Sequence, residues 1–271
     1  MAVSNTLRSV TIGSFDGIHI AHQALIARAD AVVAIERWSG YLTPGYKRAE
    51  HIGGKPLFIY DFARIRMLDA KAFVALLTAH FPHLERIVVG YDFRFGKDKQ
   101  GTPETLRRYF HGEVEVVKEV TYEGVSVHSR VIKRYIEAGD VAFAATLLGR
   151  PYRFEGRVIR GQGLGAEKLV PTLNLAVEGY VIPAQGVYAT RTRIGDRWYD
   201  SVSFWGHRVT TDGSFAVETH VIDCRLGEVE GYIEIEVHAF LRPNRKFERL
   251  EALKAAIAQD IAAAQNVFKA E

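Results

Sequence analysis

The clearest chemical pattern in the sequence is the segment Gly13–His22, which reads GSFDGIHIAH. The apolar run Val10–Ile12 precedes it, and a helical pattern that begins near Gln23 follows. A strand, a glycine turn and a helix start together form a site for phosphate. The free N–H groups of the first helical turn and the positive end of the helix dipole both attract an anion. His19 and His22 are expected to point toward that anion, so the segment predicts a phosphate or nucleotide site.

The histidine pair has two other interpretations. A His-x-x-His pair is compatible with half of a metal site, but zinc needs three or four ligands, and the only cysteine, Cys224, is distant in sequence. Two ordinary surface histidines are the second alternative. No Gly-Lys-Ser/Thr closes the turn and no G-x-G-x-x-G is present, which excludes a Walker A loop and a dinucleotide fingerprint. In its strand–glycine–helix context, the pair is similar to the signature of the nucleotidyltransferase superfamily, whose members transfer an AMP-like group from a nucleotide.

A second candidate site lies in the C-terminal half. Gly161 and Gly163 belong to a glycine-rich turn that lets the backbone approach a phosphate. Thr172 and Asn174 follow in an extended segment, where residues two apart share one side. Their hydroxyl and carbonyl oxygens are ligands that Mg²⁺ and nucleotide phosphates accept. A plain hairpin with a glycine turn explains the same residues.

Glu218 is the candidate acid–base residue of the C-terminal half. It lies in the middle of an expected strand, between Val217 and Val221. A carboxylate in this position is either inert and exposed to solvent or a general base beside a substrate hydroxyl.

The elements of the first half alternate between strands and helices, which predicts a parallel α/β sheet. The expected strands are Val10–Ile12, Ala31–Ile35, Leu57–Tyr60, Ile87–Val89 and Val114–Val117. The expected helices are Gln23–Ala29, Ala70–His80, Pro103–Phe110 and Ser129–Glu137. Ligands of such sheets bind at the C-terminal ends of strands, where both Gly13–His22 and Gly90–Gly96 fall.

The second half changes character near Leu148–Pro151 and contains short strands with glycine turns. This pattern predicts a small antiparallel barrel or sandwich. The expected strands are Tyr152–Val158, Gly186–Ile194, Arg197–Val202, Ala216–Val221 and Tyr232–Phe240. A closing helix is expected from about Lys246 to Phe268, with one apolar stripe that packs on the strands or, alternatively, binds a partner.

The composition is that of a globular protein. Of 271 residues, 48% are hydrophobic, and the formal net charge of +3 is too small to indicate binding to nucleic acid or to an anionic membrane. No apolar run approaches the roughly 20 residues that span a bilayer, and no signal-peptide pattern is present. With one cysteine there is no internal disulfide. We therefore expect a soluble cytoplasmic protein that binds no nucleic acid and no membrane and needs no obligate protein partner.

Several of these segments resemble, in the same order, those of the bacterial bifunctional riboflavin kinase/FAD synthetase family. The resembling segments are Gly13–His22, Gly90–Gly96, Leu148–Tyr152, Pro171–Asn174, Gly186–Tyr188, Glu218–His220 and Leu241–Leu250. The resemblance implies an α/β plus all-β protein with two domains. Residues 1–148 would be a Rossmann-like nucleotidyltransferase domain that adenylylates FMN. Residues 149–271 would be a riboflavin-kinase β-barrel with a closing C-terminal helix.

The resemblance also implies roles for particular residues. In the kinase, Glu218 would accept the proton of the ribityl 5′-hydroxyl of riboflavin. Thr172 and Asn174 would hold Mg²⁺ and the ATP phosphates, with Gly161 and Gly163 also at the phosphates. In the adenylyltransferase, the phosphate of FMN would attack ATP, giving FAD and pyrophosphate, while His19 and His22 stabilise charge. The residues that would bind the nucleotide or its phosphates there are Gly13, Phe15, Asp16, Asp92, Ser129 and Lys133.

The sequence departs from the family pattern at several positions. Ala21 replaces the usual glycine between the histidines, and the family's T-F-x-P-H-P segment has no counterpart after the second strand. Leu169 replaces a glycine before the P-T-x-N motif, and Phe204 replaces an asparagine. These departures keep two alternatives open: a riboflavin kinase with a degraded adenylyltransferase domain, and a non-catalytic regulator that binds flavin or nucleotide.

Overall fold

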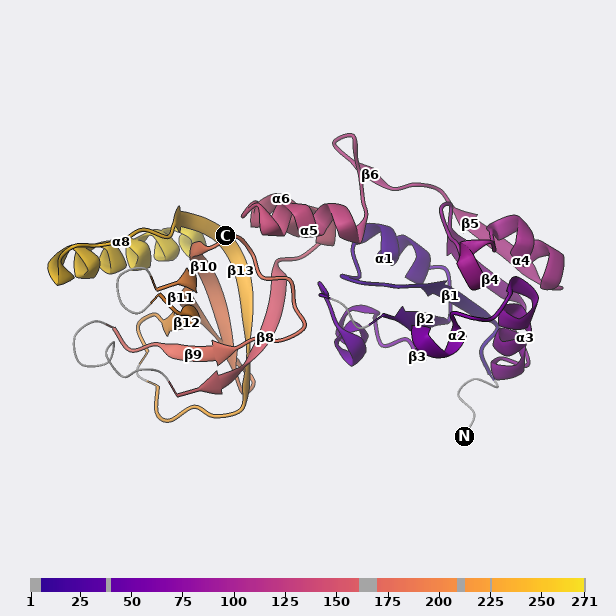
Figure 1. Ribbon diagram of the computed structural model, residues 1–271, viewed down its shortest axis with the longest axis horizontal. Coiled ribbons are helices and arrows are strands. Elements are labelled where there is room, and N and C mark those ends of the chain that lie inside the picture. Colours follow the sequence, from indigo (N-terminus) through magenta and orange to yellow (C-terminus); the bar gives the residue numbers. More distant parts are fainter. Residues whose placement is uncertain (1–5, 38–39, 161–169, 209–212, 225, 271) are drawn as a thin grey trace. The chain divides into compact units, whose positions relative to one another are not determined.

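The computed structural model describes residues 6–37, 40–160, 170–208, 213–224 and 226–270 (Figure 1). Internal contacts divide the chain into two compact units, Met1–Val131 and Ile132–Glu271. This division precedes the predicted domain boundary at residues 148 and 149, because helix α6 (Val141–Leu148) packs against strands of the second unit. The functional boundary between residues 148 and 149 stays a prediction.

The first unit is built on a five-stranded sheet in the order β3-β2-β1-β4-β5. All neighbouring strands are parallel, which confirms the expected α/β class. The strands are β1 (Ser9–Gly13), β2 (Ala31–Glu36), β3 (Leu57–Asp61), β4 (Arg86–Gly90) and β5 (Glu113–Val117). With β1 in the middle and the chain crossing outward in both directions, this is the strand order of a Rossmann-like fold.

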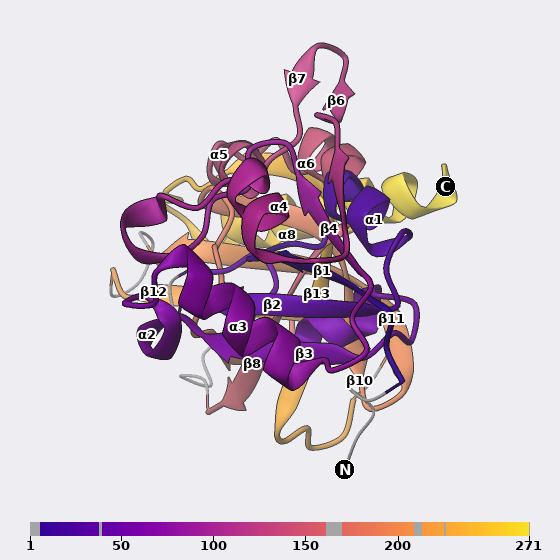
Figure 2. The ribbon, with the colours of Figure 1, turned by 90° about the vertical axis from the view of Figure 1, so that its right-hand side faces the viewer.

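Helices cover both faces of this sheet. The helical segments of the first unit are α1 (Ile20–Ile26), η2 (Gly45–His51), α2 (Phe62–Ile65), α3 (Ala70–His80), η3 (Lys97–Lys99) and α4 (Pro103–Tyr109). The short strands β6 (Thr121–Tyr122) and β7 (Val125–Ser126) form a hairpin, and α5 (Ser129–Glu137) follows. Helix α3 lies in front of the sheet in Figure 2.

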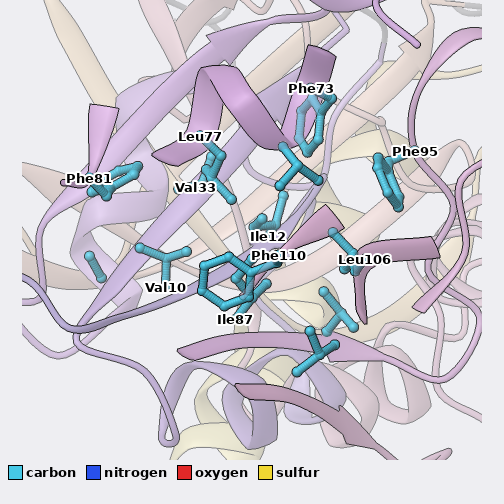
Figure 3. Close-up of a cluster of buried hydrophobic side chains, with 14 of the residues drawn as sticks. Val10, Ile12, Val33, Phe73, Leu77, Phe81, Ile87, Phe95, Leu106 and Phe110 are labelled. Carbon is cyan, nitrogen blue, oxygen red and sulfur yellow. The ribbon is translucent and has the colours of Figure 1, made fainter. Parts of the chain in front are cut away.

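Alternate residues of the buried strands face two separate cores, as a sheet covered on both faces requires. On one face, residues of β1, β2 and β4 pack against α3 and α4 (Figure 3). Phe73 and Leu77 of α3 and Phe110 after α4 contribute large side chains to this core. The other face packs against Leu25 and Ile26 of α1. Helix α1 is thereby fixed directly after β1, where the predicted site lies.

The helix boundaries differ from the expected ones where capping decides them. Helix α1 begins at Ile20 rather than Gln23, because the His19 side chain caps it by accepting a hydrogen bond from the His22 N–H. Helix α6 was not predicted, since its sequence VAFAATLL is almost wholly apolar and shows no helical period.

The second unit is a closed barrel in the order β10-β11-β12-β9-β8-β13, so the barrel alternative is the one adopted. Its strands are β8 (Tyr152–Ile159), β9 (Leu173–Ala176), β10 (Gly186–Ile194), β11 (Arg197–His207), β12 (Phe215–Val221) and β13 (Tyr232–Pro243). All pairs are antiparallel. Strand β11 continues five residues beyond the predicted end at Val202 and so includes Phe204.

The closing helix α8 (Leu250–Lys269) begins later than the predicted Lys246 and packs on the barrel. Ile261, Ala264 and Phe268 of its apolar stripe join a core with Val187 and Val202. This contact confirms that the stripe covers the strands. No helix in the described ranges is both long and apolar enough to cross a membrane.

Candidate active sites

A cavity of about 350 Å³ opens in the first unit at the C-terminal ends of three adjacent strands. Its walls include residues that follow β1, β4 and β5, together with the start of α1. The cavity therefore lies where parallel α/β sheets hold their ligands, as predicted. Of the predicted residues, the structure brings Gly13, Phe15, His19, His22, Asp92 and Ser129 to the wall of this cavity.

His19 and His22 form a stacked pair at the start of α1. Their ring centroids lie 3.5 Å apart, with 17° between the planes. The Nδ1 atom of His19 accepts from the backbone N–H of His22 at 3.3 Å. An accepting nitrogen carries no proton, so in the neutral ring the proton is on Nε2. His19 is only 3% exposed, and its backbone contact fixes both the tautomer and the ring orientation.

Phe15 packs against His22. Its fully buried ring meets the His22 ring edge-on at 5.0 Å, and it also lies against the backbone of Gly13. The backbone of Phe15 has φ of 49°, in the left-handed region that is costly for a bulky residue. Arg48 Nε donates to the Phe15 carbonyl at 3.1 Å and so holds this conformation. Phe15 is therefore a packing partner of His22.

A buried ion pair between Arg48 and Glu36 anchors that support. Both side chains are almost fully buried, and Arg48 Nη1 donates to Glu36 Oε2. Burial acts to raise the pKa of Glu36, but hydrogen bonds from Arg48, Tyr41 and the Gly45 N–H together lower that pKa below its usual value. Neither residue was predicted from the sequence. The available signal was a glutamate at the end of the apolar strand AVVAIE.

Asp16 has a different place from the predicted one. Its carboxylate Oδ1 accepts from the backbone N–H groups of Leu42 at 2.8 Å and Thr43 at 3.1 Å, and the residue is 5% exposed. The backbone carbonyl of Asp16 accepts from Ser129 Oγ at 2.8 Å. Asp16 does not line the cavity, so the structure favours a structural link over the predicted phosphate contact. Its contacts fix the loop that leads to His19.

Tyr91 and Glu119 bring a polar cluster to the cavity wall. Tyr91 donates to Glu119 at 3.0 Å, and Ser126 also donates to Glu119. These hydrogen bonds lower the pKa of Glu119. The carboxylate of Asp92 lies 3.9 Å from His128 Nδ1, and its side chain is 59% exposed. Asp92 therefore stands at the open side of the cavity.

Cationic side chains outnumber carboxylates in the cavity wall. Arg37, Arg94, Lys99 and Lys118 all contribute to the wall. Because the facing carboxylates are fewer, the wall favours a strongly anionic ligand such as a triphosphate. Arg94 lies in the predicted segment Gly90–Gly96, but none of the four residues was singled out from the sequence, since single basic residues in loops carry no pattern. Lys133, which was predicted as a site residue, lies on α5 and does not line the cavity.

The barrel gathers the second set of predicted residues. Glu218 on β12 pairs in register with Asn174 on β9 and with Phe204 on β11. Directly opposed residues of antiparallel strands present their side chains on the same face. Thr219 points the other way and is buried in a hydroxyl network with Thr192 at 2.9 Å and Ser203 at 2.9 Å. Strand alternation thus directs Glu218 away from the barrel interior, toward Asn174.

Arg208 joins Glu218 and Asn174. Its Nη2 lies 2.6 Å from Glu218 Oε1 and donates to Asn174 Oδ1 at 2.7 Å, while Nε donates to the same glutamate oxygen at 2.8 Å. Arg208 was not predicted from the sequence; it follows the end of β11 and lies more than thirty residues from Asn174. No sequence signal links the two positions.

Thr172 immediately precedes β9 and is half-buried. His220 lies 2.8 Å from the Pro171 carbonyl, to which its Nδ1 can only donate, and this contact holds the Pro171–Asn174 segment beside β12. The predicted phosphate residues Gly161 and Gly163 lie outside the described residues.

The donor set at this site fits a magnesium ion. The described ranges contain no cluster of three or more His, Cys, Asp or Glu side chains that could hold a metal. Thr172 and Asn174 offer neutral oxygens instead, and Mg²⁺ commonly binds a few protein oxygens while keeping waters and substrate phosphates. Asn174 Oδ1 already faces a cation, the Arg208 guanidinium. A carbonyl oxygen has two lone pairs, so this hydrogen bond leaves Asn174 Oδ1 one further acceptor position.

Comparison with known proteins identifies both halves of the chain. The family model described as riboflavin kinase matches residues 148–268, and the model described as FAD synthetase matches residues 42–131. The chain is 31% identical to the bifunctional riboflavin kinase/FMN adenylyltransferase of Pseudomonas fluorescens, over 94% of this chain and 91% of that protein. It is 30% identical to the protein of the same name from Listeria monocytogenes, over 93% and 89% of the two chains.

A solved structure also matches over nearly the whole length. The crystal structure described as a macrolide-efflux protein from Streptococcus pneumoniae superposes with a TM-score of 0.87 at 27% sequence identity. The match covers 98% of this chain and 95% of that one.

Proposed function

This chain belongs to the family of bifunctional riboflavin kinase/FMN adenylyltransferases, and from that membership we propose how its two units divide the two reactions. The C-terminal site phosphorylates riboflavin with ATP to give FMN. The N-terminal site joins FMN to the AMP of a second ATP, giving FAD and pyrophosphate. The positions of the candidate groups support this assignment of one reaction to each unit. His19 and His22 are in the unit Met1–Val131, and Glu218 and Asn174 are in the unit Ile132–Glu271.

In the kinase reaction, Glu218 accepts the proton of the ribityl 5′-hydroxyl as that oxygen bonds to the γ-phosphorus of ATP and ADP leaves. The support is geometric: the Glu218 carboxylate lies on the same face as Asn174, one strand away. Phosphoryl transfer depends mainly on positioning and on neutralising charge, so few side chains are required.

Thr172 and Asn174 would hold Mg²⁺ together with the ATP phosphates. Bound there, the ion would neutralise charge on the transferred phosphoryl group. The neutral oxygens of the two side chains and the orientation of the Asn174 amide support this assignment. Gly161 and Gly163 are proposed to approach the same phosphates.

In the adenylyl transfer, an FMN phosphate oxygen attacks the α-phosphorus of ATP, and the bond to pyrophosphate breaks. His19 and His22 stabilise the charge that develops on the bridging and equatorial oxygens. Their stacked arrangement at the N-terminus of α1 adds the positive end of the helix dipole. Gly13, Phe15, Asp92 and Ser129 shape the same cavity, whose excess of cations suits ATP and the departing pyrophosphate.

The proposed small-molecule partners are riboflavin, FMN, FAD and ATP. Because ATP is a substrate of both reactions, we place them in the cytoplasm.

The test is a product assay on the full chain. Purified protein with riboflavin, ATP and Mg²⁺ should form first FMN and then FAD, separated by chromatography. FMN without FAD at any ATP concentration would support the kinase-only alternative. Formation of neither product would leave the non-catalytic regulator and reject the proposal.

A further inference from the structure

One guanidinium group connects the two sides of the kinase site. We propose that Arg208 is a positioning residue of riboflavin phosphorylation, which holds the Glu218 carboxylate and the Asn174 amide in a single working arrangement. This inference rests on the proposed kinase function and adds a residue that the motifs do not contain. Arg208 acts through its two neighbours and needs no contact with substrate.

The contacts explain why an arginine suits this place. Nη2 bridges Glu218 Oε1 at 2.6 Å and Asn174 Oδ1 at 2.7 Å, and Nε adds a second bond to Glu218 at 2.8 Å. A guanidinium presents its donors in a fixed plane, so one group can fix two acceptors in a defined relation. A lysine carries the same charge on a flexible stem, without that plane.

The bridge also decides which way the Asn174 amide faces. A guanidinium can only donate, so the atom of Asn174 that faces it must be the oxygen. Without Arg208 the amide loses the contact that fixes which of its two ends carries the oxygen, and the NH₂ end offers no lone pair to a cation. Strand register alone places the Asn174 and Glu218 backbones opposite each other but leaves their side-chain torsions unset.

Arg208 is itself held by backbone and side-chain contacts. Its N–H donates to the Ser214 carbonyl at 2.8 Å, and its carbonyl accepts from the Gly213 N–H at 3.1 Å. Its Nη1 donates to Ser214 Oγ at 3.1 Å. The Arg208 and Glu218 side chains are 19% and 24% exposed, so water screens their attraction only in part. These contacts orient the Arg208 guanidinium toward Glu218 and Asn174.

The experiment compares Arg208→Gln, Arg208→Lys and Arg208→Ala in the full chain. Arg153→Gln is the matched control, because Arg153 lies on the same barrel, is similarly exposed at 26%, and pairs with Glu234 and Glu236. In Arg208→Gln and Arg208→Ala we expect kcat for FMN formation to fall about 10–100-fold, the scale of a misplaced catalytic group. KM for riboflavin should change little, and FAD formation from supplied FMN should be preserved. Arg208→Lys should recover part of kcat.

Chemical rescue separates positioning from a purely structural role. Millimolar guanidinium chloride should restore part of the kcat of Arg208→Ala, whereas tetramethylammonium chloride at equal ionic strength should not.

An unchanged kcat in Arg208→Gln overturns the inference. So does a loss that neither lysine nor added guanidinium recovers. If the wild-type chain forms no FMN, the proposed kinase function fails and this inference with it. An active wild type with an equally active Arg208→Gln rejects only the role of Arg208.

Discussion

The imidazole rings of His19 and His22 stack 3.5 Å apart, while the His22 backbone N–H donates to His19 Nδ1. One residue thus caps the helix that carries the other. The cap places the His19 proton on Nε2 and sets the first turn of α1, so both rings are fixed before any ligand binds. Prior fixation of this kind lowers the reorganisation that the reaction requires.

From this pair we predict that His22→Ala strongly reduces FAD formation from supplied FMN, because charge on the transferred phosphate loses a stabilising partner. A loss of about 10²–10³-fold in kcat is expected for one such group. FMN formation from riboflavin should stay near the wild-type rate. The two rates are measured in one preparation by chromatography. Equal damage to both reactions contradicts the assignment of His22 to one site only.

Glu218→Ala is expected to give the opposite pattern. Loss of the proposed general base should slow FMN formation by about 10²–10⁴-fold, and FAD formation from supplied FMN should be nearly unchanged. Glu230→Ala, at an exposed position outside the strands, serves as the control and should leave both rates intact. A Glu218→Ala variant that still forms FMN at the wild-type rate would exclude Glu218 as the base.

Ala21 tests the alternative of a degraded adenylyltransferase. Ala21 lies in the cavity wall and precedes His22, at the position where the family usually has glycine. We predict that Ala21→Gly lowers KM for ATP in FAD formation, because the removed methyl group gives the nucleotide more room. The glycine should also cost helix α1 roughly 0.5–1 kcal/mol.

Ala24→Gly is the matched control for that substitution, since Ala24 lies on the same helix but not in the cavity wall. It should carry a similar helix cost without the change in KM. Steady-state kinetics with FMN saturating and ATP varied measures the effect. The same KM for ATP in both variants contradicts the crowding argument.

The buried pair of Glu36 and Arg48 predicts a pH dependence of stability. The pKa of Glu36 in the folded protein is lowered, and in the unfolded chain it should be about 4.3. A lowered folded-state pKa means that the unfolded state binds the proton more readily. The stabilisation is therefore complete above the unfolded pKa and is lost as the pH falls through the folded one. Urea unfolding between pH 3 and 7 measures this loss.

Substitutions of Arg48 and Glu36 test whether this pair is the source of the acid dependence. Arg48→Met leaves a buried carboxylate without its cation and should lower the free energy of unfolding by about 3–5 kcal/mol. The double substitution Glu36→Leu with Arg48→Met should recover most of that stability and should flatten the acid dependence. FAD formation should be reduced in Arg48→Met and also in the double variant, because in both the Phe15 carbonyl has lost its Arg48 donor. An acid dependence equal to that of the wild type would exclude Glu36 as its source.

The sequence by itself determined the parts that depend on local pattern. Alternation of apolar strands with helices in the first half and alternating short strands in the second predicted a parallel sheet followed by an antiparallel unit, as found. The motif Gly13–His22 predicted a site after β1, because a glycine turn between a strand and a helix is a local feature. Glu218, Thr172 and Asn174 were likewise selected from their own short segments.

The tertiary structure alone decided what long-range contacts control. The strand pattern left a barrel or a sandwich open, and the pairing of β8 with β13, which neither strand reveals alone, closes the barrel that the family resemblance implied. It turned the Asp16 carboxylate toward the Leu42 N–H, because a buried acceptor bonds to whichever donor the fold brings near. It also brought Arg208 to Glu218 and Asn174. Such contacts join residues far apart along the chain, and their partners are set by strand register and packing rather than by local sequence.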